Sequence, residues 1–587
     1  MLVNIFIQII LILYLIMTIM ILPLYFHGTA GYSHIATDKI IFYIKSGGLL
    51  AVFSTLSLMI YYAVWMKKKV KDKYYAELDK NDYLIQRTDV ILKYLNRDVL
   101  KEMYSKHITV IFAVCYTFAI ILSYFFSNYK EAVLYGTKGW YMGFVFQMIV
   151  LIFFFILAGS ARKWKEEILG IPIIMMLVVS TVVFILGILN RYGINPLHLE
   201  NKGPQFISTI GNINWYCGYW SVVFPIGLAL FCTLKKNTKK FMQGKEVDEE
   251  TTFEGVTKNN VEDIVLYWIK KSLLAVYIVI GYMAGITQGS DTGIVVICMI
   301  LIMLGYVSIR KKEYAENFLE VIMMLCIILK ILALIQYLYP EKNTYASEIF
   351  LWLIGTDIVW LVLVVAGIVY GVLKTAKGSR HFPIYVKGWR ILSGILFLLL
   401  VGAILLVIFN TIYPGKIPQL NENTIFTFNN AWGNARGGTW TIGIWTWLSQ
   451  NNLHKLFGVG PDGMEAYLYS GMNEELLQYT RNIFGDVRLT NAHGEWITLL
   501  VNTGLFGTLS FIGMVVTAIW RFLKSKNAIA IACGMSIFAY TIHNLFSFQQ
   551  IMNVTHFFVV LAIGECVIRK GCSTNKTISC QMKCSEK

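Results

Sequence analysis

The run Val3–Phe26, VNIFIQIILILYLIMTIMILPLYF, decides the fold class of this 587-residue chain. It contains no charged residue. At about 1.5 Å per helical residue it is long enough to cross the roughly 30 Å hydrocarbon core of a bilayer. The run has no basic segment before it and is too long for the apolar region of a cleaved signal, so it predicts a first membrane helix.

Comparable apolar runs recur to the end of the chain. The sequence is 56% hydrophobic and only 15% charged, a composition that excludes an ordinary soluble protein. We expect an all-α, polytopic integral membrane protein of about 14 transmembrane helices, with one large extracytoplasmic loop. The predicted spans are residues 3–26, 40–65, 108–126, 144–161, 168–189, 217–234, 272–288, 293–309, 318–339, 350–373, 391–411, 495–520, 528–547 and 552–568.

The basic residues predict the orientation of these spans. The net charge is +16, and 38 of the 51 Lys and Arg residues fall in alternate segments between the apolar runs. Cytoplasmic loops carry such an excess, so we expect a plasma-membrane protein with cytoplasmic N- and C-termini and an extracytoplasmic loop over residues 412–494. The charge therefore reports topology and predicts no nucleic-acid partner. The ten Cys residues are scattered, mostly in apolar runs, and predict no disulfide framework.

The loop over residues 412–494 is rich in Trp, Gly, Asn, Arg and His. Trp faces stack on sugar rings, Arg forms paired hydrogen bonds with phosphate oxygens, and Gly permits close backbone approach. Several cationic side chains on the predicted external side are typical of an anion site. These candidates are Arg191, Arg436, Arg481 and Arg488, with His454 and His493.

His493 precedes the predicted helix from Glu495, in the sequence Asn491-Ala-His-Gly-Glu. A histidine there can titrate near neutral pH and accept a proton from a sugar hydroxyl, although a lone interfacial His also serves as a structural hydrogen-bonding group. No metal-ligand spacing occurs nearby, so we predict no metal and no cofactor. The glycine-rich stretch 458–463, GVGPDG, lacks the pattern of a phosphate-binding loop and predicts a turn.

Two features of the apolar scaffold have structural interpretations. Gly281, Gly285 and Gly289 recur every four residues, which favours close packing of a neighbouring helix over a ligand role. Lys330 and Asp357 lie at similar depths on consecutive predicted helices, which favours an ion pair over a proton relay.

Two stretches of the chain follow one another in and just after the predicted external loop: residues 456–463, LFGVGPDG, and residues 491–507, NAHGEWITLLVNTGLFG. Together they resemble the signature of the O-antigen ligase and polysaccharide polymerase superfamily. Upstream, Arg436 with Trp440 and Trp445 is similar to the family's Arg-to-Trp segment, and residues 211–214, GNIN, resemble its N-x-N segment. The resemblance covers roughly residues 190–510. The chain departs from it at Ser290-Asp291, where many members carry Ser-Arg.

The resemblance implies a membrane glycosyltransferase that transfers or polymerises a glycan from a polyprenyl diphosphate donor. The acceptor would be a glycan, lipid or wall-polymer hydroxyl at the outer face of the plasma membrane. His493 would activate this hydroxyl, and Arg436 would hold the diphosphate. The implied substrate-binding residues are Arg488, Arg191, Asn212, Asn214 and Trp440.

The resemblance also implies a division of the chain into three parts. Residues 1–189 would form N-terminal membrane helices with a basic cytoplasmic loop. Residues 190–510 would form the catalytic membrane region, including the loop 412–494. Residues 511–587 would form C-terminal membrane helices and a cytoplasmic tail.

Two other functions are compatible with so many membrane helices. A flippase for lipid-linked oligosaccharides, or another transporter, is the main alternative. Transporters usually carry internal repeats and short loops, whereas this chain has no obvious repeat and a long external loop. A non-catalytic assembly partner is the third interpretation, and it predicts that Arg436 and His493 are replaceable.

Overall fold

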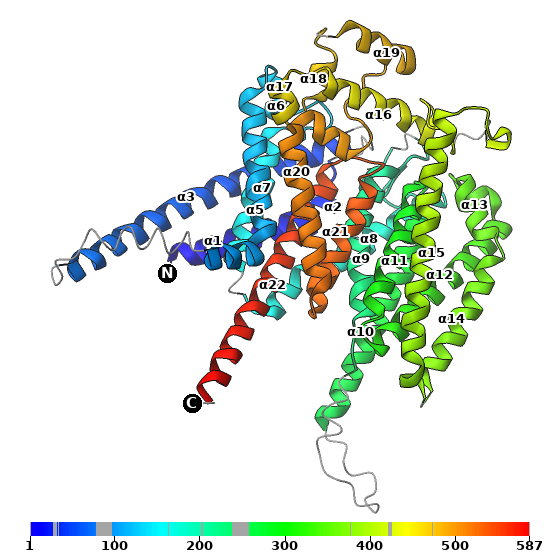
Figure 1. The fold of residues 1–587 in the computed structure, drawn as a ribbon, viewed down its shortest axis with the longest axis horizontal. Helices are drawn as coiled ribbons and strands as arrows, with labels where there is room; N and C mark the ends of the chain where they lie inside the picture. Colours follow the sequence, from blue (N-terminus) through cyan, green and yellow to red (C-terminus); the bar gives the residue numbers. More distant parts are fainter. Residues whose placement is uncertain are drawn as a thin grey trace, which may run out of the picture. The chain divides into compact units, whose positions relative to one another are not determined.

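The computed structural model describes residues 2–27, 32, 34–77, 97–161, 164–200, 203–236, 258–375, 377–420, 425–471 and 473–585 (Figure 1). The described chain is almost entirely helical. Its only strands are β1 (Phe206–Ile207) and β2 (Gly211–Asn212), which pair antiparallel in one short hairpin. The basic loop expected in the N-terminal part includes residues 78–96, which lie outside the described residues.

The helices follow in chain order. The N-terminal part contains α1 (Leu2–Leu15), the π-helix η1 (Ile16–Ile21), α2 (Leu22–Leu24), α3 (Ile35–Glu77), α5 (Arg97–Phe126), α6 (Lys130–Tyr135), α7 (Phe144–Ser160) and α8 (Glu166–Arg191). The central part contains α9 (Ile213–Cys232), α10 (Lys258–Thr287), α11 (Thr292–Ser308), α12 (Lys312–Leu338), η4 (Pro340–Lys342), α13 (Glu348–Gly355), α14 (Ile358–Lys374) and α15 (Gly378–Ile412). The C-terminal part contains η5 (Pro418–Leu420), α16 (Trp432–Leu448), α17 (Asn452–Phe457), α18 (Met464–Leu468), α19 (Glu474–Phe484), α20 (Glu495–Lys524), α21 (Ala528–His543) and α22 (Ile551–Ser585).

The helices confirm an all-α, multi-pass membrane protein. Within the described residues, 10 helices are long and apolar enough to cross a membrane, and α13 with α14 form one further candidate bent by 51°. Three shorter apolar helices are α7, α11 and α21. Every predicted span falls on one of these helices, while the number that cross the membrane and their orientation stay predictions.

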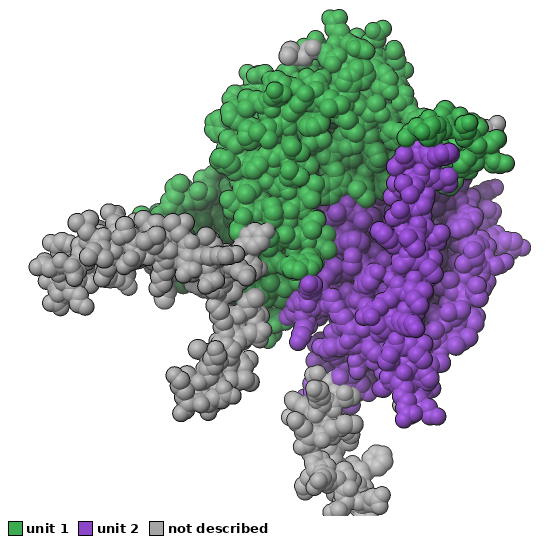
Figure 2. Space-filling model, in the orientation of Figure 1, with its two compact units in different colours: residues 1–175, 410–522, 544–587 green, residues 176–409, 523–543 purple. Residues whose placement is uncertain are grey.

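The chain forms two compact units, each discontinuous in sequence (Figure 2). Unit 1 comprises Met1–Met175, Asn410–Phe522 and Asn544–Lys587, and unit 2 comprises Met176–Phe409 and Leu523–His543. These boundaries follow packing, so the three-part functional division stays a prediction.

Unit 1 is built on aromatic and aliphatic helix packing. α7 packs against α3 and α22, and Tyr14 of α1 stacks on Phe153 of α7 with ring centroids 3.6 Å apart. The large loop also belongs to this unit and is folded. Its helices α16 to α19, called the cap helices below, surround a small core of their own that includes Ile442, Met464 and Leu476.

Unit 2 is built around α9, which is almost wholly buried and packs against α10 and α21. A Cβ atom on Gly281 would lie 2.2 Å from the ring of Phe224, and one on Gly285 would lie 2.4 Å from that of Trp220. Real Cβ atoms do not come so close, so only glycine lets these rings lie against α10. The packing interpretation is confirmed for Gly281 and Gly285, whereas Gly289 lies past the end of α10 in a turn with a φ of 89°.

The predicted ion pair between Lys330 and Asp357 is wrong. The Lys330 Nζ donates to the carbonyl oxygens of Thr356 (2.8 Å) and Ile354 (3.3 Å). These carbonyls lie at the break between α13 and α14, where a helix end leaves acceptors without an intrahelical donor. Lys330 therefore binds a helix end rather than a carboxylate.

Candidate active site

The stretches 456–463 and 491–507, called the motif stretches below, are joined by hydrogen bonds in unit 1 at a break in α20. Gly504 has a positive φ of 65° inside this helix, which frees the carbonyls of the preceding turn. Val459 N donates to Val501 O (3.1 Å), and Gly460 N donates to Asn502 O (3.0 Å). The stretch 458–463 is thus a turn, as predicted, and its glycines have a structural explanation.

His493 lies in a tight turn just before α20. Its backbone has a φ of 49°, unusual for a residue with a side chain, and its N–H donates to the Asn491 side chain at 3.0 Å. The neighbouring carbonyl of Ala492 accepts a hydrogen bond of 2.8 Å from Thr439 on α16. The turn is therefore fixed both by its own sequence and by a cap helix.

Arg436 follows a left-handed turn at the start of α16. Gly433, Asn434 and Ala435 have φ values of 60°, 60° and 65°. This turn allows the Arg436 Nη1 to donate to Gly433 O (2.6 Å), while the Nε donates to Phe546 O (2.7 Å). The guanidinium is held on two backbone carbonyls.

Trp440 lies one turn of α16 beyond Arg436. A Cβ atom on Gly494 would be 2.8 Å from the Trp440 indole nitrogen, so the glycine after His493 is what admits this ring. The indole also lies against Phe546, with ring centroids 6.1 Å apart, and against Trp432 at 5.3 Å. Such an aromatic cluster is typical of a surface on which a sugar ring stacks.

Residues 544–549, NLFSFQ, form a third segment of the site, which the sequence analysis missed. The prediction extended a span to residue 547, but α21 ends at His543. The segment supplies Phe546 O to Arg436, and its Phe548 ring meets the His493 ring edge to face at 5.2 Å. The polar residues Asn544, Ser547 and Gln549, which interrupt an apolar run, were the available signal.

Glu495 attaches this segment to α20. Its backbone N–H donates to Asn544 O (3.0 Å) and Ser547 O (2.8 Å), and its carboxylate accepts from Gln549 N (2.6 Å). The side chain is 3% exposed. Glu495 therefore positions the segment that contacts both Arg436 and His493.

The electrostatics of the site favour a neutral His493. Burial and the nearby charge of Arg436 lower the pKa of His493 to about 4. The His493 Nδ1 and the Trp440 Nε1 are buried without a hydrogen-bond partner. An unpaired buried polar group costs about 1–3 kcal/mol, so a ligand that hydrogen-bonds to these two atoms would remove that cost.

A polar cavity of about 40 Å³ adjoins this turn. Asp462, Asn491, Glu495 and Gln549 contribute to its lining, and it is large enough for a water molecule but not for a sugar. Asp462 accepts backbone hydrogen bonds from Thr137 (2.8 Å) and Met142 (3.1 Å). Burial raises the pKa of Asp462 to about 7 in spite of these bonds.

Arg488 contacts a different part of unit 1. Its Nε pairs with Glu465 at 2.7 Å, and its guanidinium lies over the Tyr469 ring at 4.4 Å. The carboxylate of Glu465 already offsets much of the positive charge of Arg488. The predicted role of Arg488 in substrate binding is therefore less favoured by its surroundings than that of Arg436.

Arg191, Asn212 and Asn214 belong to unit 2, where they meet around the α10–α11 turn. Arg191 is fully buried and donates to Pro204 O and Gln288 O, from Nη1 and Nη2 respectively. Asn212 caps α9 through Asn214 N (2.8 Å), and the Asn214 side chain accepts from Ser290 (3.0 Å). The three residues that the resemblance implied are therefore neighbours in unit 2. Most of their polar side-chain atoms form hydrogen bonds within the protein.

No group of three or more His, Cys, Asp and Glu side chains that could hold a metal ion occurs among the residues that the structure describes. No protein-family model matches the chain, and no curated protein matches it.

Proposed function

We propose that this protein is a membrane glycosyltransferase that takes a glycan from a polyprenyl diphosphate donor and transfers it to an acceptor hydroxyl at the outer face of the plasma membrane. The observation that carries the proposal is the arrangement around one turn of unit 1. A neutral histidine with an unpartnered nitrogen lies beside a guanidinium and an aromatic cluster with an unpartnered indole N–H.

The chemistry assigns one task to each group. The acceptor oxygen attacks the anomeric carbon of the donor, the bond from that carbon to the diphosphate oxygen breaks, and the hydroxyl proton passes to His493. Arg436 stabilises the negative charge that develops on the leaving diphosphate, as a preorganised cation can. Trp440 stacks on a sugar ring and donates its indole N–H to a sugar oxygen.

The charges also link donor binding to proton transfer. In the free protein the positive charge of Arg436 contributes to the low pKa of His493. A bound diphosphate would offset that charge, which raises the basicity of His493 when the acceptor is to be deprotonated. This coupling makes a histidine with such a low pKa suitable as a base in the donor complex.

Backbone strain supports the same location. Four non-glycine residues near this turn have a positive φ. The value is 60° for Asn434, 65° for Ala435, 58° for Asp462 and 49° for His493. Each such residue costs about 1–3 kcal/mol and persists only where surrounding contacts impose it, often at functional sites. The four lie in or next to the motif stretches.

The test uses cells that lack the gene, complemented with wild type, His493→Ala or Arg436→Gln at matched membrane levels. Surface glycan length and the accumulation of lipid-linked donor are measured. We expect both variants to accumulate donor, with transfer reduced by about 100-fold or more. Loss of chain length with single units still attached indicates a polymerase, whereas loss of all attached glycan indicates a ligase.

Arg481→Gln is the matched control, because Arg481 is an exposed residue of α19 in the same cap. It should transfer glycan like wild type. Full activity of folded His493→Ala and Arg436→Gln would remove the proposed site and favour a transporter or an assembly partner.

A further inference from the structure

A second site lies in unit 2, in an apolar cavity of about 620 Å³ bounded by α12, α14 and α15. The three helices lie next to one another in Figure 1. Its volume is within the range of about 300–1,000 Å³ that holds small-molecule ligands. Leu319, Val369, Leu373 and Trp389 are among its lining residues, which leave almost no polar surface.

The cavity is bordered by an apolar cluster that α12, α14 and α15 share. α14 packs on α12 through Leu319, Ala366 and Leu373, and Phe382 of α15 packs against the same cluster. Elsewhere α15 is held by a few contacts: Tyr306 donates to Ser393 at 2.9 Å, and the Trp389 ring meets Phe318 at 5.2 Å. α15 is otherwise largely exposed, so the space between it and α14 is accessible to a membrane lipid.

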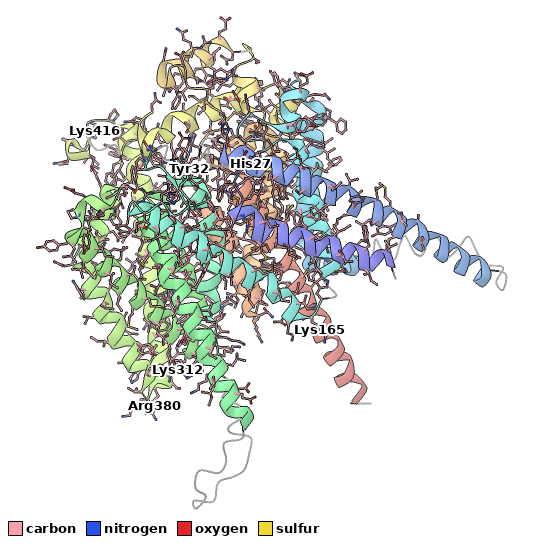
Figure 3. The ribbon with its side chains drawn as sticks, turned by 180° about the vertical axis from the view of Figure 1, so that it is seen from behind. His27, Tyr32, Lys165, Lys312, Arg380 and Lys416 are labelled. Atoms are coloured by element: carbon pink, nitrogen blue, oxygen red, sulfur yellow. The ribbon has the colours of Figure 1, made fainter. Side chains whose placement is uncertain are left out.

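One end of the cavity has a basic rim. Lys374 follows the lining residue Leu373, and Lys377 and Arg380 precede the lining residue His381. Lys312 belongs to the same rim, because its Nζ would lie 2.8 Å from a Cβ atom on Gly378. Lys312 and Arg380 lie at neighbouring helix ends in Figure 3.

Acidic side chains only partly offset this rim. Glu316 pairs with Lys374 at 3.2 Å and with Lys312 at 3.8 Å. Glu320, on the next turn of α12, already pairs with Lys271 at 2.7 Å. Lys377 and Arg380 are exposed, so the rim keeps positive charge that faces outward.

We infer that this cavity binds an anionic glycerophospholipid of the membrane, with an acyl chain between α14 and α15 and the phosphate at Lys377 and Arg380. The apolar lining fits the chain, and the charge of the rim fits the head group. Basic residues next to a membrane helix attract anionic lipids by about 1 kcal/mol each.

The chain offers matched variants for both halves of the site. Gly388 lines the cavity, and nothing lies within 4 Å of a Cβ atom placed on it, so Gly388→Phe is chosen to place a bulky ring at the cavity wall. Gly394 of the same helix is equally open but lies outside the lining, so Gly394→Phe is its control. Lys377→Gln with Arg380→Gln removes the rim charge, and Lys387→Gln with Arg390→Gln removes the same charges elsewhere on α15.

The experiment titrates the delipidated full chain in detergent with phosphatidylglycerol or phosphatidylcholine and counts bound lipid by native mass spectrometry. We expect wild type to prefer phosphatidylglycerol by about fivefold for each rim charge engaged. The rim variant should lose this preference and Gly388→Phe should lose binding of both lipids, whereas the two controls behave like wild type.

Three results would overturn the inference. They are equal binding of the two lipids by wild type, unchanged binding by Gly388→Phe, and displacement of phosphatidylglycerol by a polyprenyl phosphate that binds the same cavity more tightly. The last result would assign the cavity to the lipid-linked donor instead.

Discussion

The polar cluster around His493 in unit 1 and the one around Arg191 in unit 2 contain similar residues that are held by different contacts. Arg191 is fully buried and donates to two backbone carbonyls that join neighbouring loops. His493 and Trp440 each keep a buried nitrogen without a partner. Arg191 also keeps its buried Nε without a partner, so the clusters differ in which side chains have hydrogen-bonding capacity left: an arginine in unit 2, and a histidine and a tryptophan in unit 1.

The comparison gives a criterion that residue type alone does not provide. The same resemblance pointed to both clusters, and both contain an arginine and aromatic rings. What separates them is which polar atoms stay without a partner: the Nε of Arg191 in unit 2, and the Nδ1 of His493 and the Nε1 of Trp440 in unit 1. The location of the reacting groups in unit 1 stays a proposal, and we expect Arg191, which donates to Gln288 O, to position the turn between α10 and α11.

The largest expected effect is a difference in transfer activity between variants of Arg436 and Arg191. Arg436→Gln should reduce glycan transfer by about 100-fold to 1,000-fold, because a charge at the leaving group acts mainly in the transition state. Its thermal stability should stay close to that of wild type. Transfer assays with purified protein and lipid-linked donor measure the first quantity, and a melting curve in detergent measures the second. Equal losses of stability in Arg436→Gln and Arg191→Gln would remove the distinction between the clusters.

Arg191→Gln should show the reverse pattern. It leaves Pro204 O and Gln288 O without their donors, so we expect a loss of about 2–3 kcal/mol in the free energy of unfolding. The activity of the folded fraction should change little. Denaturant unfolding in mixed micelles measures the stability, and rates normalised to folded protein measure the activity. A stable Arg191→Gln variant with abolished transfer would place Arg191 in the reaction after all.

A smaller effect distinguishes two buried tryptophans. Trp440→Phe keeps the aromatic ring but removes an indole N–H that has no partner, so it should lower transfer by about tenfold without loss of stability. Trp220→Phe removes an indole N–H that donates to Gly281 O at 2.8 Å, so it should cost about 1 kcal/mol of stability and leave transfer unchanged. The same two assays apply, and the interpretation fails for Trp440 if the two variants behave alike.

The smallest expected effect is a pH dependence. His493 has a pKa of about 4 in the folded chain, below its ordinary value of 6.5. Between these pH values the unfolded chain binds more protons than the folded chain, so the free energy of unfolding falls as pH decreases from 6.5 to 4. At pH 7 this destabilisation by His493 is nearly absent. Asp462, whose folded pKa is raised to about 7 from 3.8, acts in the opposite direction over the whole of this range.

The pH effect is therefore measured as a difference from His493→Gln. Wild type should lose about 1 kcal/mol more than this variant between pH 7 and pH 5.5. In an Arg436→Gln background the difference should shrink, because the charge that lowers the pKa of His493 is gone. Identical pH profiles for wild type and His493→Gln would contradict the buried, neutral histidine.

The sequence by itself determined the fold class and the location of the helices. Runs such as Val3–Phe26 must satisfy every backbone group inside the bilayer, and a helix does so using only local hydrogen bonds. The turn at residues 458–463 and the close packing at Gly281 and Gly285 were also predictable, because glycine spacing expresses local geometry. His493, Arg436 and Trp440 could be selected as chemistry-bearing residues in the same way.

Only the tertiary structure decided which polar atoms are left unpaired. Arg191 and Arg436 are equivalent in sequence terms, and each donates to two backbone carbonyls. Which carbonyls each one meets depends on the packing of segments that are distant in sequence. The segment 544–549 binds two residues that are distant in sequence. Its Phe546 is 110 residues from Arg436, and its Gln549 is 54 residues from Glu495. Lys330 likewise binds the end of α13 instead of Asp357 because a break in the helix exposes carbonyls. Such contacts depend on how helices are broken and packed, which no local pattern encodes.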